Sequence, residues 1–270
     1  MQESPYPRPW VIAHRGASDT HAEHTLAAYE QAVKDGADGL ECDVRLTRDG
    51  HLVCVHDRRV ERTSDGRGVI STKRLDELNR FDWSSWKNPW ADLDDEAELP
   101  DTEGRVVLTL HSLLGMVQDH DQPLTVSIET KHPTRYSGLV ERMLVELLDH
   151  FGLARPSSGV SSARVMSFSL LSMRRLTRMA PAVPLVWLMD GKLPARVGDG
   201  RLPAGVGTAG PSCELVRENP DWVRRVDKRG HGVHVWTVNT AEDAKMCQSL
   251  PVEAVITDRP QMMRQWLTRD

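Results

Sequence analysis

The chain has few cysteines, and their spacing is not that of a disulfide framework or a zinc site. Its four cysteines, Cys42, Cys54, Cys213 and Cys247, form no C-x-x-C pair. This pattern fits a reducing compartment. The N-terminus also lacks a basic segment followed by an apolar one, so no secretory signal is predicted. We therefore expect a cytoplasmic protein.

Long apolar runs and basic runs are missing as well. The most apolar segment, residues 183–189, is far too short to cross a membrane, so no integral membrane segment is expected. Lysine and arginine number 34 against 39 acidic residues, a net charge of −5, and no basic run suggests a nucleic-acid surface. The expected partner is therefore a small molecule, while the oligomeric state stays open.

The length of 270 residues allows one large barrel or two modest domains. Strands separated by helical stretches along most of the chain favour a single α/β barrel domain spanning residues 1–270. The predicted strands are residues 10–13, 39–45, 52–55, 124–129, 164–168, 185–188, 204–207, 233–238 and 254–257. This is more than the eight of a (β/α)₈ barrel, so at least one of them is not a barrel strand.

The connection between the second and third strands allows two interpretations. Residues 48–50, Arg-Asp-Gly, predict a tight turn, which favours an antiparallel hairpin. Both strands nevertheless present polar groups at their far ends, as parallel barrel strands would. The sequence does not decide between these geometries.

Residues 58–104 break the regular pattern, and we expect them to form a small insertion after the third strand, over one end of the barrel. Within it, residues 71–78 predict a short helix capped by Ser71 or Thr72. Trp83, Trp86 and Trp90 suit either a small satellite core or a lid that faces the substrate, and packing is the commoner use of buried aromatic side chains.

Two carboxylates lie two residues apart in the second strand. Strand side chains alternate between faces, so Glu41 and Asp43 point the same way. An exposed strand with acids facing water is the simple interpretation. The same spacing of charged residues recurs at Glu129 and Lys131, however, and close carboxylates repel each other unless a cation lies between them.

If the early strands are neighbours, the polar groups at their ends converge on one rim: His14, Arg15, Glu41, Asp43, His56, Glu129 and Lys131. Three carboxylates without cysteine make an all-oxygen ligand set that suits Mg²⁺ or Ca²⁺. With one divalent ion and two basic residues, the group keeps one net positive charge, which complements a single phosphodiester. Two histidines can move protons. The set therefore predicts metal-assisted phosphodiester cleavage.

Several short motifs together resemble the glycerophosphodiester phosphodiesterase family. They are His14-Arg15-Gly16, Glu41-Cys42-Asp43-Val44, Thr47-Arg48-Asp49-Gly50, Val55-His56-Asp57, Glu129-Thr130-Lys131, Ser167-Phe168, Trp236-Thr237-Val238-Asn239 and Thr257-Asp258-Arg259-Pro260. The resemblance implies a TIM-type barrel and an enzyme of lipid and glycerol metabolism that hydrolyses glycerophosphodiesters, such as glycerophosphocholine or glycerophosphoethanolamine, to glycerol 3-phosphate and an alcohol.

The resemblance also implies site roles, position by position. Glu41, Asp43 and Glu129 match the metal ligands, His14 and His56 match the acid–base pair, and Arg15 and Lys131 match the phosphate clamp. Trp236, at a strand end, has room to pack against the glycerol or the head group. We expect His56 to be the base and His14 the acid, with either water or the glycerol 2-hydroxyl as the attacking group.

One position departs from the family pattern, and two other functions stay open. The family commonly shows Glu-Asn-Thr where this chain has Glu23-His24-Thr25, which leaves the roles of Glu23 and His24 undecided. The alternatives are a related barrel phosphodiesterase acting on lysophospholipids, or a barrel that binds phosphodiesters without turnover.

Overall fold

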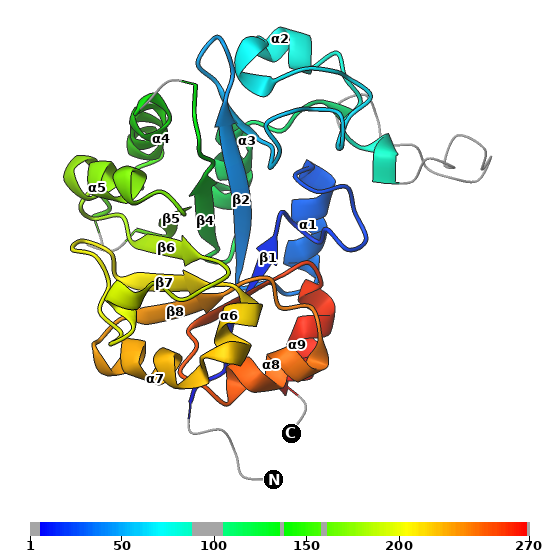
Figure 1. Ribbon diagram of the computed structural model, residues 1–270. Helices are drawn as coiled ribbons and strands as arrows, with labels where there is room; N and C mark the ends of the chain where they lie inside the picture. The colour runs from blue at the N-terminus through cyan, green and yellow to red at the C-terminus, as the bar shows by residue number, and fades with distance from the viewer. Residues whose placement is uncertain (1–5, 88–104, 136–137, 158–160, 269–270) are drawn as a thin grey trace.

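The computed structural model describes residues 6–87, 105–135, 138–157 and 161–268. Its centre is one sheet that closes on itself (Figure 1), with strand order β1-β9-β8-β7-β6-β5-β4-β2-β3 and a further pairing of β1 with β2. All neighbours around the ring are parallel. The ring strands are β1 Trp10–His14, β2 Gly39–Leu46, β4 Thr125–Thr130, β5 Ala163–Ser167, β6 Leu185–Met189, β7 Thr208–Pro211, β8 Gly232–Val235 and β9 Ala254–Thr257.

Helices connect most of the strands and lie outside the ring (Figure 1). They are α1 Leu26–Lys34, α2 Leu75–Leu78, α3 Leu110–Gln118, α4 Leu139–His150, α5 Leu170–Met179, α6 Cys213–Glu218, α7 Pro220–Lys228, α8 Ala241–Gln248 and α9 Pro260–Thr268, with 3₁₀ turns η1 Ile70–Thr72, η2 Ser85–Lys87 and η5 Ala195–Val197. This arrangement is the predicted TIM-type barrel. In the described part of the chain, no helix is long and apolar enough to cross a membrane.

The core has an inner and an outer part. Ile12, Met166, Val186, Leu188 and Ile256 form a buried cluster inside the barrel. A larger cluster fills the layer between the sheet and the helices, where side chains on the other face of each strand meet the apolar faces of the helices. Both faces of the strands are therefore buried, as parallel sheets require.

The third predicted strand is not part of the ring. Strand β3, Leu52–Cys54, pairs antiparallel with the far end of β2. The turn between them uses Gly50 at φ +90°, a conformation that glycine adopts without steric cost. The hairpin interpretation is thus correct, and β3 carries the chain back toward the ring, where the backbone of Val55 donates to Asp43 O at 3.0 Å.

Two local predictions were wrong. The strand predicted at residues 204–207 is a loop with Gly205 at φ +81°, and the strand follows it as β7. After Thr208, the residues of β7 are Ala-Gly-Pro, which have little strand preference of their own, so pairing with β6 and β8 decides their conformation. The helix predicted from residue 71 is interrupted by an extended Lys73, and α2 begins after Arg74 instead of after Ser71 or Thr72.

The segment between β3 and α3 builds a separate small core near the end of β2 (Figure 1). Trp83 is buried there with Val53, Ile70 and Leu78, and its indole nitrogen donates to Leu78 O at 2.9 Å. Trp83 is therefore a packing residue. Trp90 lies outside the described residues, and the bounds 58–104 for an insertion stay a prediction.

Candidate functional site

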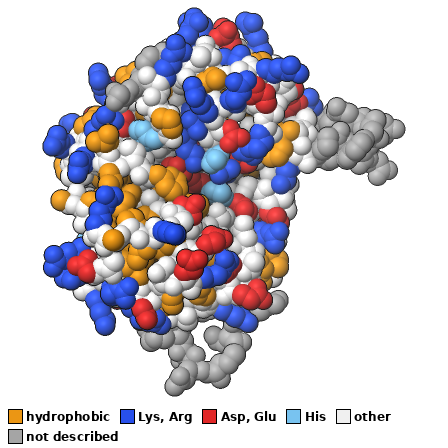
Figure 2. Space-filling view, in the orientation of Figure 1, with side chains coloured by type: hydrophobic (Ala, Val, Ile, Leu, Met, Phe, Trp, Pro, Cys, Tyr) orange, Lys and Arg blue, Asp and Glu red, His pale blue; other side chains and the backbone are white. Residues whose placement is uncertain are grey.

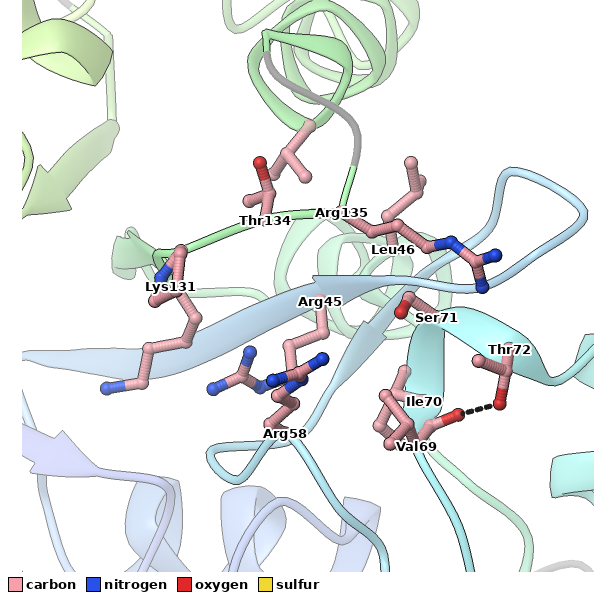
Figure 3. A pocket seen from close by; sticks show the side chains of 12 residues that line it. Arg45, Leu46, Arg58, Val69, Ile70, Ser71, Thr72, Lys131, Thr134 and Arg135 are labelled. Atoms are coloured by element: carbon pink, nitrogen blue, oxygen red, sulfur yellow. Dashed lines mark hydrogen bonds between the residues drawn. The ribbon is translucent and has the colours of Figure 1, made fainter.

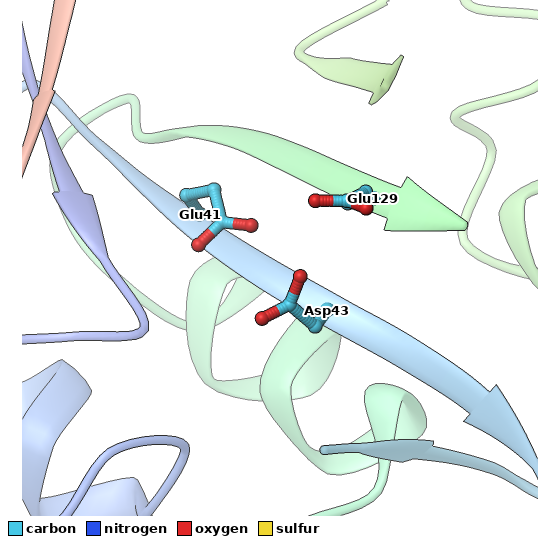
Figure 4. A group of neighbouring side chains, drawn as sticks. All are labelled: Glu41, Asp43 and Glu129. Carbon is cyan, nitrogen blue, oxygen red and sulfur yellow. The ribbon is translucent and has the colours of Figure 1, made fainter. Parts of the chain in front are cut away.

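Three buried carboxylates meet at the carboxyl ends of two adjacent ring strands. Glu41 and Asp43 project from β2, and Glu129 projects from β4, where it is the register partner of Asp43. One oxygen of each lies within 4.8 Å of the others. Figure 4 shows the three carboxylates directed into a common space. This cluster could hold a metal ion, since all its donors are hard oxygen atoms.

Burial and crowding shift the pKa values of all three carboxylic acids. Burial, together with the charge of Asp43, raises the pKa of Glu41 well above its usual range. The same two causes raise the pKa of Glu129 to about 7. Burial would also raise the pKa of Asp43, but a hydrogen bond from His24 and the charges of Lys131 and Arg15 hold it well below its usual value. Without a cation among them, the three groups therefore do not all ionise easily.

Two basic side chains contact the acids. Lys131 Nζ lies 2.9 Å from both Asp43 Oδ1 and Glu129 Oε1. Arg15 Nε lies 3.0 Å from Asp43 Oδ2, and the Arg15 backbone donates to Glu41 Oε2 at 3.1 Å. Both basic side chains are largely buried, at 11% and 16% exposure, so their charges act through little water.

The two predicted histidines each have a carboxylate on Nδ1. His14, at the end of β1, lies 2.6 Å from Asp258 Oδ1, and His56, just after β3, lies 2.7 Å from Asp57 Oδ1. No described residue forms a hydrogen bond with the Nε2 atom of His14 or His56, so both Nε2 atoms are free to contact a substrate. Burial, with the charges of Arg15 and Lys131, lowers the pKa of His56 to about 4.

Sequence reasoning assigned no role to several residues that hold the site together. Asp57 and Asp258 belong to the motifs Val55-His56-Asp57 and Thr257-Asp258-Arg259-Pro260. Their place in these motifs is the sequence signal that could have identified them as partners of the histidines. Asp258 is further held by Ser18 and Asn239, at 2.9 and 2.6 Å. Arg62 carried no signal in the sequence.

Arg62 links Glu23, which contacts Arg15, to Asp57, which contacts His56. Its guanidinium contacts both oxygens of Glu23 at 2.7 Å and Asp57 Oδ2 at 2.5 Å. Glu23 in turn contacts Arg15 at 3.0 Å. Although burial opposes it, the hydrogen bond from Arg62 and the charge of Arg15 lower the pKa of Glu23 to about 2. Glu23 therefore acts on Arg15 as a fixed anion.

His24, the position that departs from the family pattern, is also drawn into the site. It is 5% exposed, and its backbone has φ +61°, which is rare for a residue with a side chain. Its Nε2 lies 3.0 Å from Asp43 Oδ2 and its Nδ1 lies 2.8 Å from the Tyr29 hydroxyl, which donates to Glu41 O. His24 thus supports a predicted metal ligand without facing the cavity itself.

A cavity of about 180 Å³ joins these groups to an apolar wall. Trp236 packs edge to face against Phe168, with ring centroids 5.5 Å apart, and its indole nitrogen donates to Gly210 O. Histidines and acidic side chains gather near the middle of the face shown in Figure 2. The lining includes six of the seven predicted polar site residues and Trp236, and the seventh, Asp43, contacts Arg15 and Lys131. The fold brings all the predicted site residues together, while their roles stay predictions.

Comparisons with known proteins agree on one family. The sequence model of the "Glycerophosphoryl diester phosphodiesterase family" matches residues 14–262. A relative from Mycobacterium tuberculosis, named "Probable glycerophosphodiester phosphodiesterase 1", is 44% identical over 261 residues, which covers 96% of this chain and 92% of the relative. A "Glycerophosphodiester phosphodiesterase" from Bacillus subtilis is 32% identical over 256 residues, covering 93% of this chain and 84% of the relative.

Solved structures give the same fold. A phosphodiesterase from Oleispira antarctica, solved with the product sn-glycerol-3-phosphate, superposes with a TM-score of 0.79 at 23% identity, and 97% of each chain is covered. A glycerophosphodiester phosphodiesterase from Agrobacterium tumefaciens superposes with a TM-score of 0.73 at 22% identity, covering 95% of this chain and 99% of the other.

Proposed function

Because the chain belongs to the glycerophosphoryl diester phosphodiesterase family and is an enzyme of that class, we propose that it cleaves glycerophosphodiesters with one divalent cation and a histidine pair. The substrates are compounds such as glycerophosphocholine and glycerophosphoethanolamine, and the products are glycerol 3-phosphate and an alcohol. The observation that carries the proposal is the meeting of three carboxylates, two basic side chains and two histidines around one cavity.

Glu41, Asp43 and Glu129 are the proposed ligands of the cation. The fit rests on their donor set, three carboxylates with no sulfur donor, and on the crowding of these buried acids, which raises the pKa values of Glu41 and Glu129. Hard oxygen donors suit Mg²⁺ or Ca²⁺. When bound, the cation would draw negative charge from the phosphate.

Arg15 and Lys131 are the proposed phosphate clamp. Arg15 is held on one side by Glu23, so its guanidinium is positioned before the substrate arrives. Lys131 sits between Asp43 and Glu129, where the phosphate oxygens would be close. Fixed positive charge at this place stabilises the extra negative charge of the transition state.

His14 and His56 transfer protons on the two sides of the phosphate. Asp258 and Asp57 fix their ring orientation through Nδ1, so Nε2 is the reacting nitrogen in each. A negatively charged phosphodiester beside His56 would raise its pKa from about 4, which favours the protonated ring when substrate is bound. The side on which the alcohol leaves decides which histidine is the acid.

The test is a metal-dependent substrate assay. Purified protein should release glycerol 3-phosphate from glycerophosphocholine, EDTA should stop the reaction, and Mg²⁺ or Ca²⁺ should restore it. Glu41→Ala and His56→Ala should each lose roughly 10²-fold or more in rate. Full activity of both variants would refute the site, and faster turnover of lysophosphatidylcholine would favour the lysophospholipid alternative. Phosphodiester binding without product would favour the binding barrel.

An activated leaving group assigns the acid. The p-nitrophenyl ester of glycerol 3-phosphate releases an anion that needs no proton, so loss of the acid histidine costs little with this substrate. The variant that keeps activity on the p-nitrophenyl ester but not on glycerophosphocholine identifies the acid.

Two predictions concern the whole protein. We propose that residues 1–270 form one catalytic domain, which limited proteolysis would test by yielding no separately folded fragment. We also propose a cytoplasmic location and a role in lipid and glycerol metabolism, which cell fractionation and growth on glycerophosphodiesters would check.

A further inference from the structure

A second cavity adjoins the candidate active site. It has a volume of about 280 Å³ and is lined by the far end of β2, the turn η1 and the segment after β4 (Figure 3). A third cavity, of about 260 Å³, lies next to both: it shares His56, Glu129, Lys131 and Phe168 with the active site, and Arg45 and Lys131 with the second cavity. His56 therefore lines the space between the active site and the second cavity.

The second cavity, called the basic cleft below, is lined by basic side chains, of which Lys131 is already paired with Asp43 and Glu129. Arg45, Arg58, Lys131 and Arg135 line it, and none of the described lining residues is acidic. Arg45 and Arg58 form no ion pair with any described carboxylate. Arg45 Nε and Nη2 instead both donate to the carbonyl of His56, at 2.9 and 2.7 Å. The carboxylates of Asp43, Asp57 and Glu129 act on the Arg45 charge through space, and none of them pairs with its guanidinium.

Arg45 and Arg58 also lie next to each other. Figure 3 shows their side chains side by side, between Lys131 and the turn η1. Two like charges at the wall of a cleft repel each other, and a bound anion is what would relieve that repulsion.

We propose that the basic cleft binds an anionic group, a phosphate or a carboxylate, carried by the alcohol part of the substrate. This inference rests on the proposed function and adds a substrate class to it. Glycerophosphodiesters differ from one another only in the alcohol. A cleft that distinguishes between these substrates must therefore bind the alcohol. If the alcohol lies in the cleft, its leaving oxygen is next to His56. His56 is then the acid that protonates this oxygen, and His14 is the base. The sequence analysis expected the opposite assignment.

A matched substrate pair tests the proposal. The neutral substrate is the diester of glycerol 3-phosphate with 1,3-propanediol, and the charged one carries a phosphate on the free end of the propanediol. At low salt, kcat/KM for the charged substrate should exceed that for the neutral one by about tenfold or more. This ratio should shrink as salt screens the cleft.

Variants locate the effect. Arg58→Gln should lower the ratio of the two kcat/KM values by about tenfold at low salt, and Arg135→Gln should lower it in the same direction. The control is Arg80→Gln, an arginine with 75% exposure that lies outside the cleft and pairs with Asp76. It should leave the ratio unchanged. The His56→Ala variant should keep activity on the p-nitrophenyl ester.

The outcomes separate this inference from the proposed function. Hydrolysis of neither substrate would overturn the proposed function and the inference with it. Equal kcat/KM values for the two substrates, or an unchanged ratio in Arg58→Gln, would overturn the inference while the proposed function stands. Retention of p-nitrophenyl activity by the His14→Ala variant instead of His56→Ala would also overturn it.

Discussion

Glu129 makes the metal-free protein less stable as the pH rises, and the Glu129→Gln substitution should remove that loss. In the folded protein its pKa is raised from 4.5 to about 7. The folded state therefore binds this proton more tightly than the unfolded state does. The stability is intact below about pH 4.5 and is lost as the pH rises through about 7.

The size of the effect follows from the two pKa values. Each tenfold change in proton affinity is worth about 1.4 kcal/mol, so ionising Glu129 in the metal-free site costs about 3 kcal/mol of unfolding free energy. Glu129 is only 7% exposed, so water does little to screen this cost. A domain is stable by about 5–15 kcal/mol, and a change of this size is readily measured.

His56 requires that the effect be measured as a difference. Its pKa is lowered to about 4, so its stability contribution runs in the opposite direction over part of the same pH range. Both proteins contain His56, and subtracting their unfolding free energies removes its contribution. The quantity to follow is thus the free energy of unfolding of Glu129→Gln minus that of the wild type.

Urea denaturation in EDTA from pH 5 to pH 8 provides the measurement. We expect Glu129→Gln to gain about 2–3 kcal/mol on the wild type over this range, because part of the loss already occurs below pH 5. Excess Mg²⁺ should reverse the order, because the wild type binds the ion better. Glu218→Gln, an exposed carboxylate on α6, is the control and should follow the wild type. A difference between Glu129→Gln and the wild type that does not change with pH would refute the reasoning.

Three further predictions concern the supports of the site. Asp258→Asn should lower kcat by roughly 10²-fold with little change in KM, because His14 loses the carboxylate that orients it; steady-state kinetics would show this. His24→Ala should weaken Mg²⁺ binding by about 10–100-fold in a calorimetric titration, because Asp43 loses a hydrogen bond. Tyr29→Phe should cost about 1–3 kcal/mol in urea denaturation, because the Glu41 carbonyl loses one of its two donors and the buried His24 Nδ1 loses its partner.

Each of these three predictions would be contradicted by a different result. A rise in KM alone for Asp258→Asn would show that Asp258 supports substrate binding instead of proton transfer. Unchanged metal affinity in His24→Ala would make His24 a packing residue only. Wild-type stability of Tyr29→Phe would mean that water replaces the lost hydroxyl.

The sequence by itself determined the local features whose cause is local. The two-residue period of a strand places Glu41 and Asp43 on one face, and β2 has them there. Thr25 caps α1 by accepting a hydrogen bond from Ala28, as its position before an amphipathic stretch predicts. The alternation of strands and helices predicted the barrel, since buried parallel strands need helices between them.

Only the tertiary structure decided the features that depend on distant partners. His14 meets Asp258 across 244 positions of the chain, and Arg62 joins Glu23 to Asp57, because closure of the ring brings β1 beside β9 and the hairpin beside β1. No periodicity in the sequence reports such pairings. The antiparallel return of β3 likewise places His56, since a hairpin and a parallel strand begin with similar local patterns and differ only in what they pair with.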